Sequence, residues 1–351
     1  MIMKIPAYCK NFSCIADKCS DNCCIGWEID IDSSSAEYYK SVSGSFGNKL
    51  KKSITEDNCP SFVLNGERCP FLNQQNLCEI IINLGEDKLC QICRDHPRYF
   101  EWFADVKEGG VGLCCEEAAR LIVTSKEKFA TYDTDCDDSG CDDYSPELYD
   151  MLTFARDEII AVLENGSLPL KERIGIAVSY TKEIQLLADN YIFDKVPIGN
   201  YCPEENESAD VKSFLQAFSD LEPIDESWQG YLNGLIDSSD ILHKNLGVLQ
   251  DSCDLYLKNI AVYFVWRYFL KGVYDEEIIS KIMLMAVSTA MIKLMYLHSF
   301  LSGNSLNDEI CSLTAKSYSK ETEYSEENLE KIFDAVYENS AFSAENVLAI
   351  L

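Results

Sequence analysis

Cysteine placement constrains the fold of this chain more than any other feature. Of its 17 cysteines, 14 lie before residue 146, and only Cys202, Cys253 and Cys311 follow. A core that merely tolerated cysteine would distribute these residues along the whole chain. In a chain of 351 residues that is expected to meet a reducing thiol pool, such clustering favours metal ligation over disulfide bonds.

Two sequence features bear on where the protein resides. The start, MIMKIPAYCKNFSC, has no apolar run of the secretory kind, which predicts a cytoplasmic protein. The most apolar stretch, residues 278–300, contains Lys281 and Lys293, and its uncharged run covers only residues 282–292. Since a membrane span needs about 20 apolar residues, we interpret this stretch as a buried core helix and expect no membrane partner.

The formal net charge of −29 makes nucleic acid a poor partner, because binding it depends on neutralising phosphates with Lys and Arg. The same charge would attract a protein segment rich in lysine. Solubility alone is the simpler explanation of the charge.

The sequence predicts a mainly α fold in two parts. Residues 1–130 are expected to form a loop-rich, cysteine-cluster metal-binding domain with a short strand or two, one of them ending near Asp32 after the alternating WEIDID. Residues 131–145, which include DTDCDDSGCDDY, are expected to be an acidic linker. Residues 146–351 are expected to form an α-helical domain that begins with Ser145 as N-cap and Pro146 in the first turn.

Apolar residues at helical spacing mark the helices of the second part. The first is expected from Pro146 to Leu163, where Asn165-Gly166 ends it. The others are expected at 170–190, 211–221, 227–241, 255–271, 276–299 and 326–338. The aromatic residues of the 255–271 helix are most simply core, with a peptide-binding groove as the alternative; they are Tyr256, Tyr263, Phe264, Trp266, Tyr268 and Phe269.

Three cysteine groups supply candidate metal ligands. They are Cys14-x4-Cys19-x3-Cys23-Cys24, then Cys69, Cys78 and Cys90-x2-Cys93, and finally the pair Cys114-Cys115. Thiolate ligands suit zinc or iron–sulfur clusters, whereas calcium and magnesium prefer oxygen. Because only His96 lies near the cysteines, a four-cysteine zinc site and a [4Fe–4S] cluster both remain open.

At these residues the sequence resembles the flagellin lysine N-methylase family, whose cysteine region is similar to a zinc- or iron-chelating domain. The matching segments are FSCIADKCSDNCCIGWEIDID at 12–32, CPFLNQQNLCEI at 69–80, LCQICRDHPRYF at 89–100, CCEEAARL at 114–121 and, more weakly, YSKETEYSEENLEKI near the C-terminus. Tyr324 in the last segment replaces a histidine that is common in the family, so a role attached to that position does not transfer.

The resemblance implies a protein-lysine N-methyltransferase that uses S-adenosylmethionine, acts on flagellin or a flagellin-like protein, and holds an iron–sulfur cluster, with zinc as the alternative metal. The cysteines that it marks as ligands are Cys14, Cys19, Cys23, Cys24, Cys69, Cys78, Cys90, Cys93 and Cys115, with Gly26, Trp27, Pro97 and Arg98 beside them. The chain lacks the CxxxCxxC spacing of radical S-adenosylmethionine enzymes, since position 26 is glycine.

The run HPRYFEWF that follows Cys93 is the predicted wall of a cofactor pocket. Arg98 would pair with the cofactor carboxylate, and the rings of Tyr99 and Trp102 would stabilise a sulfonium by cation–π attraction. The glycine-rich EGGVG at 108–112 lacks the context of a dinucleotide fingerprint and predicts a turn. No catalytic base is identified.

Two other functions fit the same residues. The metal could serve only as a staple in a non-enzymatic zinc- or iron-binding module that holds a partner, or the cysteines could form a redox sensor.

Overall fold

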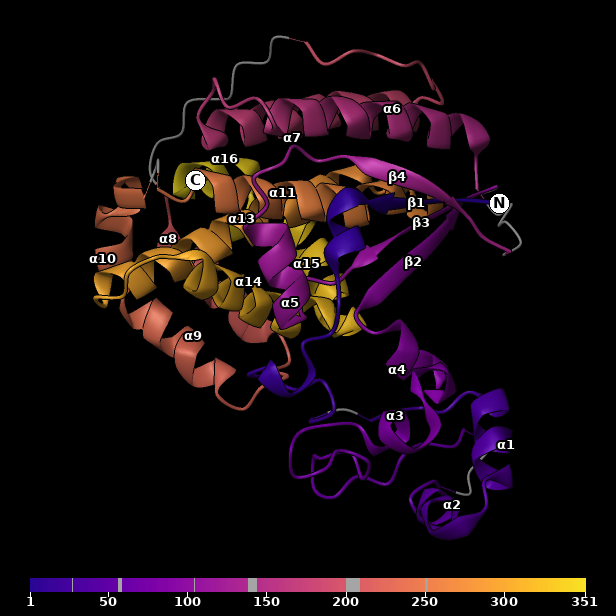
Figure 1. The fold of residues 1–351 in the computed structure, drawn as a ribbon. Coiled ribbons are helices and arrows are strands. Elements are labelled where there is room, and N and C mark those ends of the chain that lie inside the picture. Colours follow the sequence, from indigo (N-terminus) through magenta and orange to yellow (C-terminus); the bar gives the residue numbers. More distant parts are fainter. Residues whose placement is uncertain (27, 56–58, 104, 138–143, 200–208, 250–251) are drawn as a thin grey trace. The chain divides into compact units, whose positions relative to one another are not determined.

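The computed structural model describes residues 1–26, 28–55, 59–103, 105–137, 144–199, 209–249 and 252–351 (Figure 1). The chain forms two compact units. One, the helical unit, comprises residues 1–11, 100–114 and 118–351, and the other, the cysteine-rich unit, comprises residues 12–99 and 115–117. Trp27 and residues 138–143, which belong to the expected family motif and the expected linker, lie outside the described residues.

A four-stranded sheet of order β2-β3-β1-β4 explains why the units divide where they do. Its strands are β1 (Ile2–Pro6), β2 (Arg98–Phe103), β3 (Val106–Val111) and β4 (Thr131–Asp135). Strand β1 pairs in parallel with β3, from Ile2 opposite Val106, and antiparallel with β4, from Ile2 opposite Asp135. The N-terminus therefore joins the helical unit, so the structure does not follow the boundary expected at residue 130, and residues 131–135 form a strand instead of linker.

The glycine-rich segment at 108–112 was expected to be a turn, and this prediction was wrong. Residues through Val111 belong to β3, in the middle of the sheet, with Gly109 and Gly110 buried. The Trp266 indole Nε1–H donates a hydrogen bond to the Gly109 carbonyl at 3.3 Å. Glycine fits here because a side chain would separate the strand from that ring.

Helices account for most of the helical unit, as the sequence predicts. They are α6 (Pro146–Leu163), α7 (Leu170–Asp189), α8 (Val211–Ala217), α9 (Trp228–Asp237), α10 (Ser239–Lys244), α11 (Asp254–Tyr268), α12 (Gly272–Asp275), α13 (Ile278–Leu301), α14 (Asp308–Glu323), α15 (Glu326–Glu338) and α16 (Ala344–Ile350). The Ser145 hydroxyl accepts from the Leu148 N–H and caps α6 as expected. Sequence reasoning missed α12, α14 and α16, and it joined α9 and α10 into one helix.

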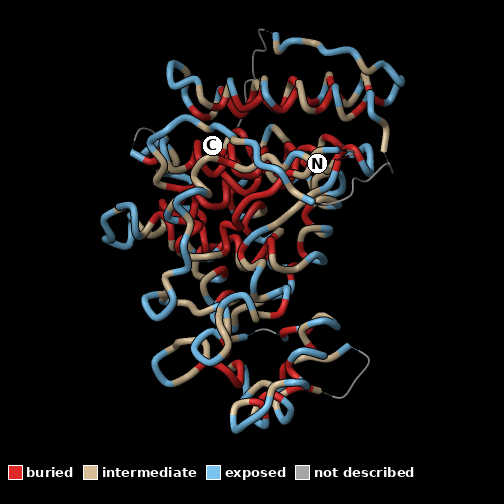
Figure 2. Tube along the Cα trace, turned by 45° about the vertical axis from the view of Figure 1, so that its right-hand side comes forward, coloured by how far each residue is buried: buried red, intermediate tan, exposed pale blue. Residues whose placement is uncertain are grey.

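Helix α13 forms the centre of this unit. It packs against α7, α11, α14, α15 and α16, and its buried residues run from Ile278 to Leu297 with few gaps. By length and composition α13 is the one described helix that could cross a membrane, and 94% of its apolar window is buried. The expected buried core helix is therefore confirmed, and Figure 2 shows the buried residues gathered within the bundle.

The cysteine-rich unit holds short helices joined by loops. They are α1 (Ser33–Ser41), α2 (Gly44–Lys52), α3 (Glu79–Leu84), α4 (Gln91–Asp95) and the start of α5 (Glu116–Val123). The expected strand ending near Asp32 is reduced to an isolated bridge between Asp30 and Ser61, although Ile29 and Ile31 are buried as the alternation predicts. Asp32 instead caps α1, accepting from the Ser35 N–H.

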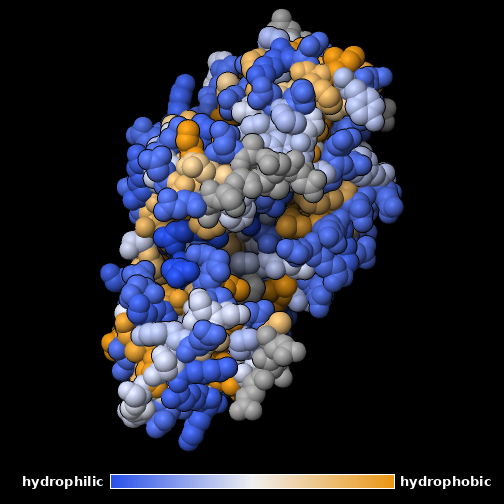
Figure 3. All heavy atoms as spheres, turned by 90° about the vertical axis from the view of Figure 1, so that its right-hand side faces the viewer, coloured by the Kyte–Doolittle hydropathy of each residue, from blue (hydrophilic) through white to orange (hydrophobic). Residues whose placement is uncertain are grey.

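The outer surface reflects the charge of the chain. The face drawn in Figure 3 is mostly hydrophilic, with scattered apolar side chains. This distribution agrees with a formal net charge of −29.

Candidate functional site

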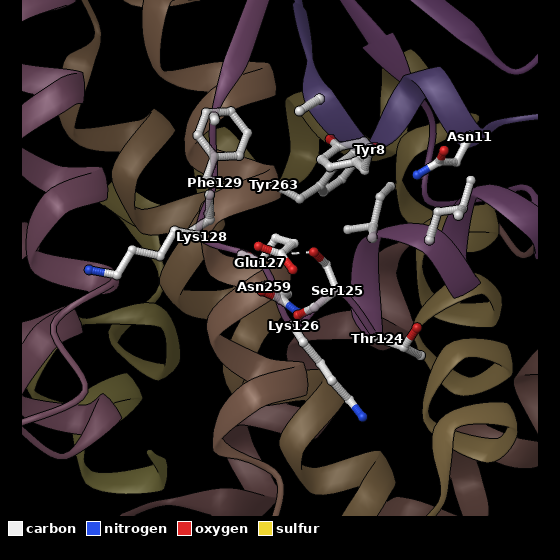
Figure 4. Close-up of a pocket in the computed structure, with 15 residues that line it drawn as sticks. Tyr8, Asn11, Thr124, Ser125, Lys126, Glu127, Lys128, Phe129, Asn259 and Tyr263 are labelled. Atoms are coloured by element: carbon white, nitrogen blue, oxygen red, sulfur yellow. Dashed lines mark hydrogen bonds between the residues drawn. The ribbon is translucent and has the colours of Figure 1, made fainter.

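A cavity of about 440 Å³ opens in the helical unit. Three stretches that are distant in sequence line it: the 3-10 turn Ala7–Asn11, the segment 121–130 that ends α5 and leads to β4, and helix α11 (Figure 4). Small-molecule sites usually measure about 300–1,000 Å³. The cavity is thus large enough for a small organic ligand.

Helix α11 presents three residues to this cavity because of its periodicity. Asn259, Val262 and Tyr263 line it and occupy positions i, i+3 and i+4, which share one helix face. The rings of Tyr8 and Phe129 also line the cavity. The cavity is therefore bounded by three aromatic rings and by the side-chain amides of Asn11 and Asn259.

Asn259 connects α11 to the segment after α5. Its side chain is 7% exposed, and Nδ2 donates to the Val123 carbonyl at 2.9 Å and to the Ser125 carbonyl at 2.8 Å. These bonds use both amide hydrogens. Among the described residues Oδ1 has no hydrogen-bond partner, so the cavity contains an acceptor without a donor.

A buried carboxylate holds Tyr263 in place. Glu323 Oε2 accepts from the hydroxyls of Tyr263 at 2.8 Å and Tyr268 at 2.9 Å, and it pairs with Arg267 Nη1 at 2.6 Å. Its Oε1 accepts from the Ser319 hydroxyl at 2.5 Å. Because the Glu323 side chain has no exposed surface, these donors replace the water that the charge would otherwise need.

A second buried ion pair, between Arg156 and Glu108, supports the cavity residue Phe129. Both guanidinium nitrogens Nη1 and Nη2 of Arg156 donate to Glu108, at 2.6 and 2.7 Å. The Arg156 guanidinium lies 4.2 Å from the centre of the Trp266 ring, and Phe129 packs on that ring with centroids 5.3 Å apart. The position of Phe129 is therefore supported by its tilted packing on Trp266, which in turn contacts the bidentate ion pair of Arg156 and Glu108.

The cysteine-rich unit gathers thiols from three of its segments. Cys69 and Cys90 belong to its hydrophobic core, and Cys24, Cys78 and Cys93 pack against that core. Cys23 interacts with both Cys24 and His96. Six of the nine expected metal ligands thus lie in one neighbourhood, close enough to influence one another electrostatically.

Paired thiols in this group have opposite pKa shifts. The hydrogen bond with Cys24 lowers the pKa of Cys23 to about 4, with His96 acting in the same direction, and it raises the pKa of Cys24. The hydrogen bond between Cys90 and Cys93 lowers the pKa of Cys90 and raises that of Cys93. Each pair therefore favours one thiolate sharing a proton with its neighbour.

The chemistry of this donor set fits a thiolate-ligated metal group. Iron–sulfur clusters and structural zinc select cysteine sulfur. Burial raises the pKa of Cys69 to about 11, so forming its thiolate is unfavourable, and a bound metal cation would offset that cost. Within the described ranges, no three side chains of the Cys, His, Asp or Glu type converge with the geometry of a bound ion. The ligands are assembled in one core, but the coordination sphere is not preformed.

The remaining three expected ligands are placed differently. Cys14 is exposed, and its sulfur accepts from the Ala16 N–H at 3.4 Å. The Cys19 thiol donates to Glu116 Oε2 at 3.6 Å, and the half-buried Cys115 precedes that residue. Among the described residues, no contact places Cys14 in the group of six.

The expected cofactor-binding residues divide between the units. Arg98, in the cysteine-rich unit, lies with its guanidinium 5.3 Å from the centre of the Phe12 ring and lines an open cavity of about 600 Å³. Tyr99 belongs to the same unit. Trp102 belongs to the helical unit, where Lys107 Nζ lies 4.7 Å from its ring centre. Their role in binding a cofactor stays a prediction.

Sequence reasoning did not single out the residues that line the cavity of the helical unit, apart from Tyr263 in the aromatic helix. One clue was present, because Asn259 and Arg267, together with Lys258, are polar residues in the mostly apolar run from Leu257 to Tyr268. Polar residues inside a buried helix need partners. That rule identifies these positions, but it does not identify the partners.

The C-terminal part of the chain is similar to a known protein family. The FliB lysine N-methylase C-terminal domain matches residues 249–350. The flagellar biosynthetic protein FliU of Salmonella muenchen is 28% identical over 137 residues, covering 36% of this chain and 79% of that protein. No solved structure matches the chain.

Two relatives are named for their activity. The lysine-N-methylases of Salmonella choleraesuis and Salmonella typhimurium are each 27% identical over 136 residues, covering 36% of this chain and 33% of the relative. The chain thus spans about a third of the length of these two enzymes in the match. The resemblance to the lysine N-methylase family is confirmed.

Proposed function

We propose that this chain, whose residues 249–350 correspond to the FliB lysine N-methylase C-terminal domain, is a protein-lysine N-methyltransferase that uses S-adenosylmethionine and acts on flagellin or a flagellin-like protein. One observation carries the proposal. The matched segment contains α11, which lines the cavity, and the buried carboxylate Glu323, which holds Tyr263 there.

The reaction places two demands on the protein. S-adenosylmethionine supplies an electrophilic methyl group, and the lysine amine, with an ordinary pKa of about 10.4, must be neutral to attack it. Aromatic rings around the cavity would stabilise the sulfonium cation of S-adenosylmethionine and exclude water. The Glu127 carboxylate lies at the cavity, where it can orient the ammonium and accept its proton (Figure 4).

The proposal gives the cysteine-rich unit an iron–sulfur cluster, with zinc as the alternative. The residues that would hold it are Cys23, Cys24, Cys69, Cys78, Cys90 and Cys93. Five of them lie in or against one core, Cys23 contacts Cys24, and all six supply the donor type that such clusters select. Four of these six satisfy a [4Fe–4S] cluster.

Methyl transfer provides the test of the activity. The full chain, purified without oxygen, is incubated with flagellin and S-adenosylmethionine labelled in the methyl group. We expect label on flagellin lysines, and none on flagellin whose lysines were acetylated beforehand. Absence of transfer with a loaded metal centre would refute the proposed activity and leave the non-enzymatic metal-binding module.

Metal analysis tests the centre separately. We expect iron and acid-labile sulfide, a brown colour from sulfur-to-iron charge transfer, and loss of most iron in Cys69→Ser. The matched control is Cys59→Ser, because Cys59 is exposed and lies outside the group of six. If the protein is colourless and contains stoichiometric zinc, the metal centre is a zinc site and not an iron–sulfur cluster. If both variants contain equal iron, Cys69 is not a ligand.

A further inference from the structure

The cavity of the helical unit carries an unmet hydrogen-bonding requirement. Asn259 is buried at 7% exposure, both Nδ2 hydrogens donate to backbone carbonyls, and Oδ1 has no partner among the described residues. Oδ1 is not one of the fully enclosed unpaired polar atoms, so it is open to the cavity, where water or a ligand can reach it. The two Nδ2 bonds fix the amide orientation, so Oδ1 is held ready for an N–H group of a ligand.

The rest of the lining specifies what else the ligand should carry. The rings of Tyr8, Phe129 and Tyr263 supply flat apolar faces with negative potential, which suit an aromatic base and a cation. Phe129 and Tyr263 are both held by buried ion pairs, through Trp266 and Glu323 respectively. Rings that are fixed before binding lose little entropy when a ligand arrives.

Two lysines at the cavity add positive charge that could pair with a negatively charged group of the ligand. Lys126 and Lys128 line the cavity and are exposed, and Figure 4 shows their side chains extending away from the labelled aromatic residues. They flank Glu127 in the sequence, so the segment 126–128 carries a net positive charge. They provide a counter-charge for a ligand carboxylate.

We infer that this cavity is where the chain binds S-adenosylmethionine, with Asn259 Oδ1 accepting an N–H of the ligand and Phe129 contributing cation–π attraction to the sulfonium. The inference rests on the proposed function and adds its cofactor site. It assigns the cofactor to residues of the helical unit, in place of the wall expected around Arg98.

Titration calorimetry with the full, anaerobically purified chain tests this assignment without measuring activity. S-adenosylmethionine and S-adenosylhomocysteine are compared as ligands, because only the first carries the sulfonium charge. Phe129→Leu should weaken binding of S-adenosylmethionine about fivefold and that of S-adenosylhomocysteine much less, since cation–π attraction contributes about 0.5–2 kcal/mol. Phe300→Leu is the matched control, because Phe300 is exposed and does not line the cavity.

A second variant tests the acceptor. Asn259→Ala should weaken both ligands about tenfold, because it removes the hydrogen-bond partner that both share. Thermal unfolding is measured beside it, since the same change releases the carbonyls of Val123 and Ser125. If Asn259→Ala does not fold, the ratio of the two affinities in Phe129→Leu still decides the question.

The outcomes separate this inference from the proposed function. Wild-type binding that Phe129→Leu leaves unchanged for both ligands would overturn the site, while methyl transfer to flagellin would keep the function. The expected binding pattern without any transfer would support the site and refute the function. Failure of the wild-type chain to bind S-adenosylmethionine would overturn the site.

Discussion

Replacing Glu323 by glutamine tests whether the buried carboxylate organises the helical unit. Three donors converge on its Oε2, from Tyr263, Tyr268 and Arg267, and Ser319 donates to Oε1. A glutamine amide has a single acceptor oxygen with two lone pairs and adds two N–H groups. At least one of the three donors at Oε2 therefore loses its partner.

The expected cost follows from burial. Arg267 retains 16% side-chain exposure, so its charge stays mostly desolvated after the carboxylate is gone. Breaking a buried pair by removing one partner costs about 3–5 kcal/mol. Since a domain has a total unfolding free energy of about 5–15 kcal/mol, Glu323→Gln should remove a large fraction of the stability of this unit.

Urea unfolding followed by far-UV circular dichroism measures this loss. Glu330→Gln is the control, because Glu330 is exposed on α15 and its replacement should change the unfolding free energy by less than about 0.5 kcal/mol. A loss below about 1 kcal/mol in Glu323→Gln, with an unchanged denaturant slope, would refute the view that the carboxylate is the charged centre of the network.

Three further predictions concern the same unit. Arg156→Ala and Glu108→Ala should each lower the free energy of unfolding by about 3–5 kcal/mol. In a double-mutant cycle, the double variant should lose less than the sum of the two single losses. Ser145→Ala should cost about 1 kcal/mol through loss of the α6 cap, measured by thermal unfolding. Burial lowers the pKa of Lys293 to about 8, so the unfolded chain binds more protons between pH 8 and 10.5 and stability attributable to this residue should rise with pH in that window. Lys293→Met should lack this rise, and equal pH profiles would contradict the assigned shift.

Local patterns were sufficient for most of the long helices. The apolar spacing from Leu148 to Leu163, with a serine cap before it and Asn165-Gly166 after it, predicts α6 because each signal acts within a few residues. Clustered thiols likewise predict a thiolate site, and this stays a prediction. Five of the nine expected ligands lie in or against one core, and Cys23 contacts that group through Cys24.

Long-range pairing was beyond such patterns. Strand β1 pairs with β3 about a hundred residues later, and this pairing moves the N-terminus into the helical unit. The same pairing makes the segment with Gly109 and Gly110 part of a central strand, because β3 lies between β2 and β1. Trp266 of α11 then donates a hydrogen bond to the Gly109 carbonyl. Neither partner is visible from the segment itself.

The cavity of the helical unit shows the same division. The sequence determined that Asn259 and Tyr263 share a helix face, because a helix repeats every 3.6 residues. Only the tertiary structure decided that Tyr8, Phe129 and Glu323 surround them, because contacts between residues far apart in the chain depend on how every intervening element packs.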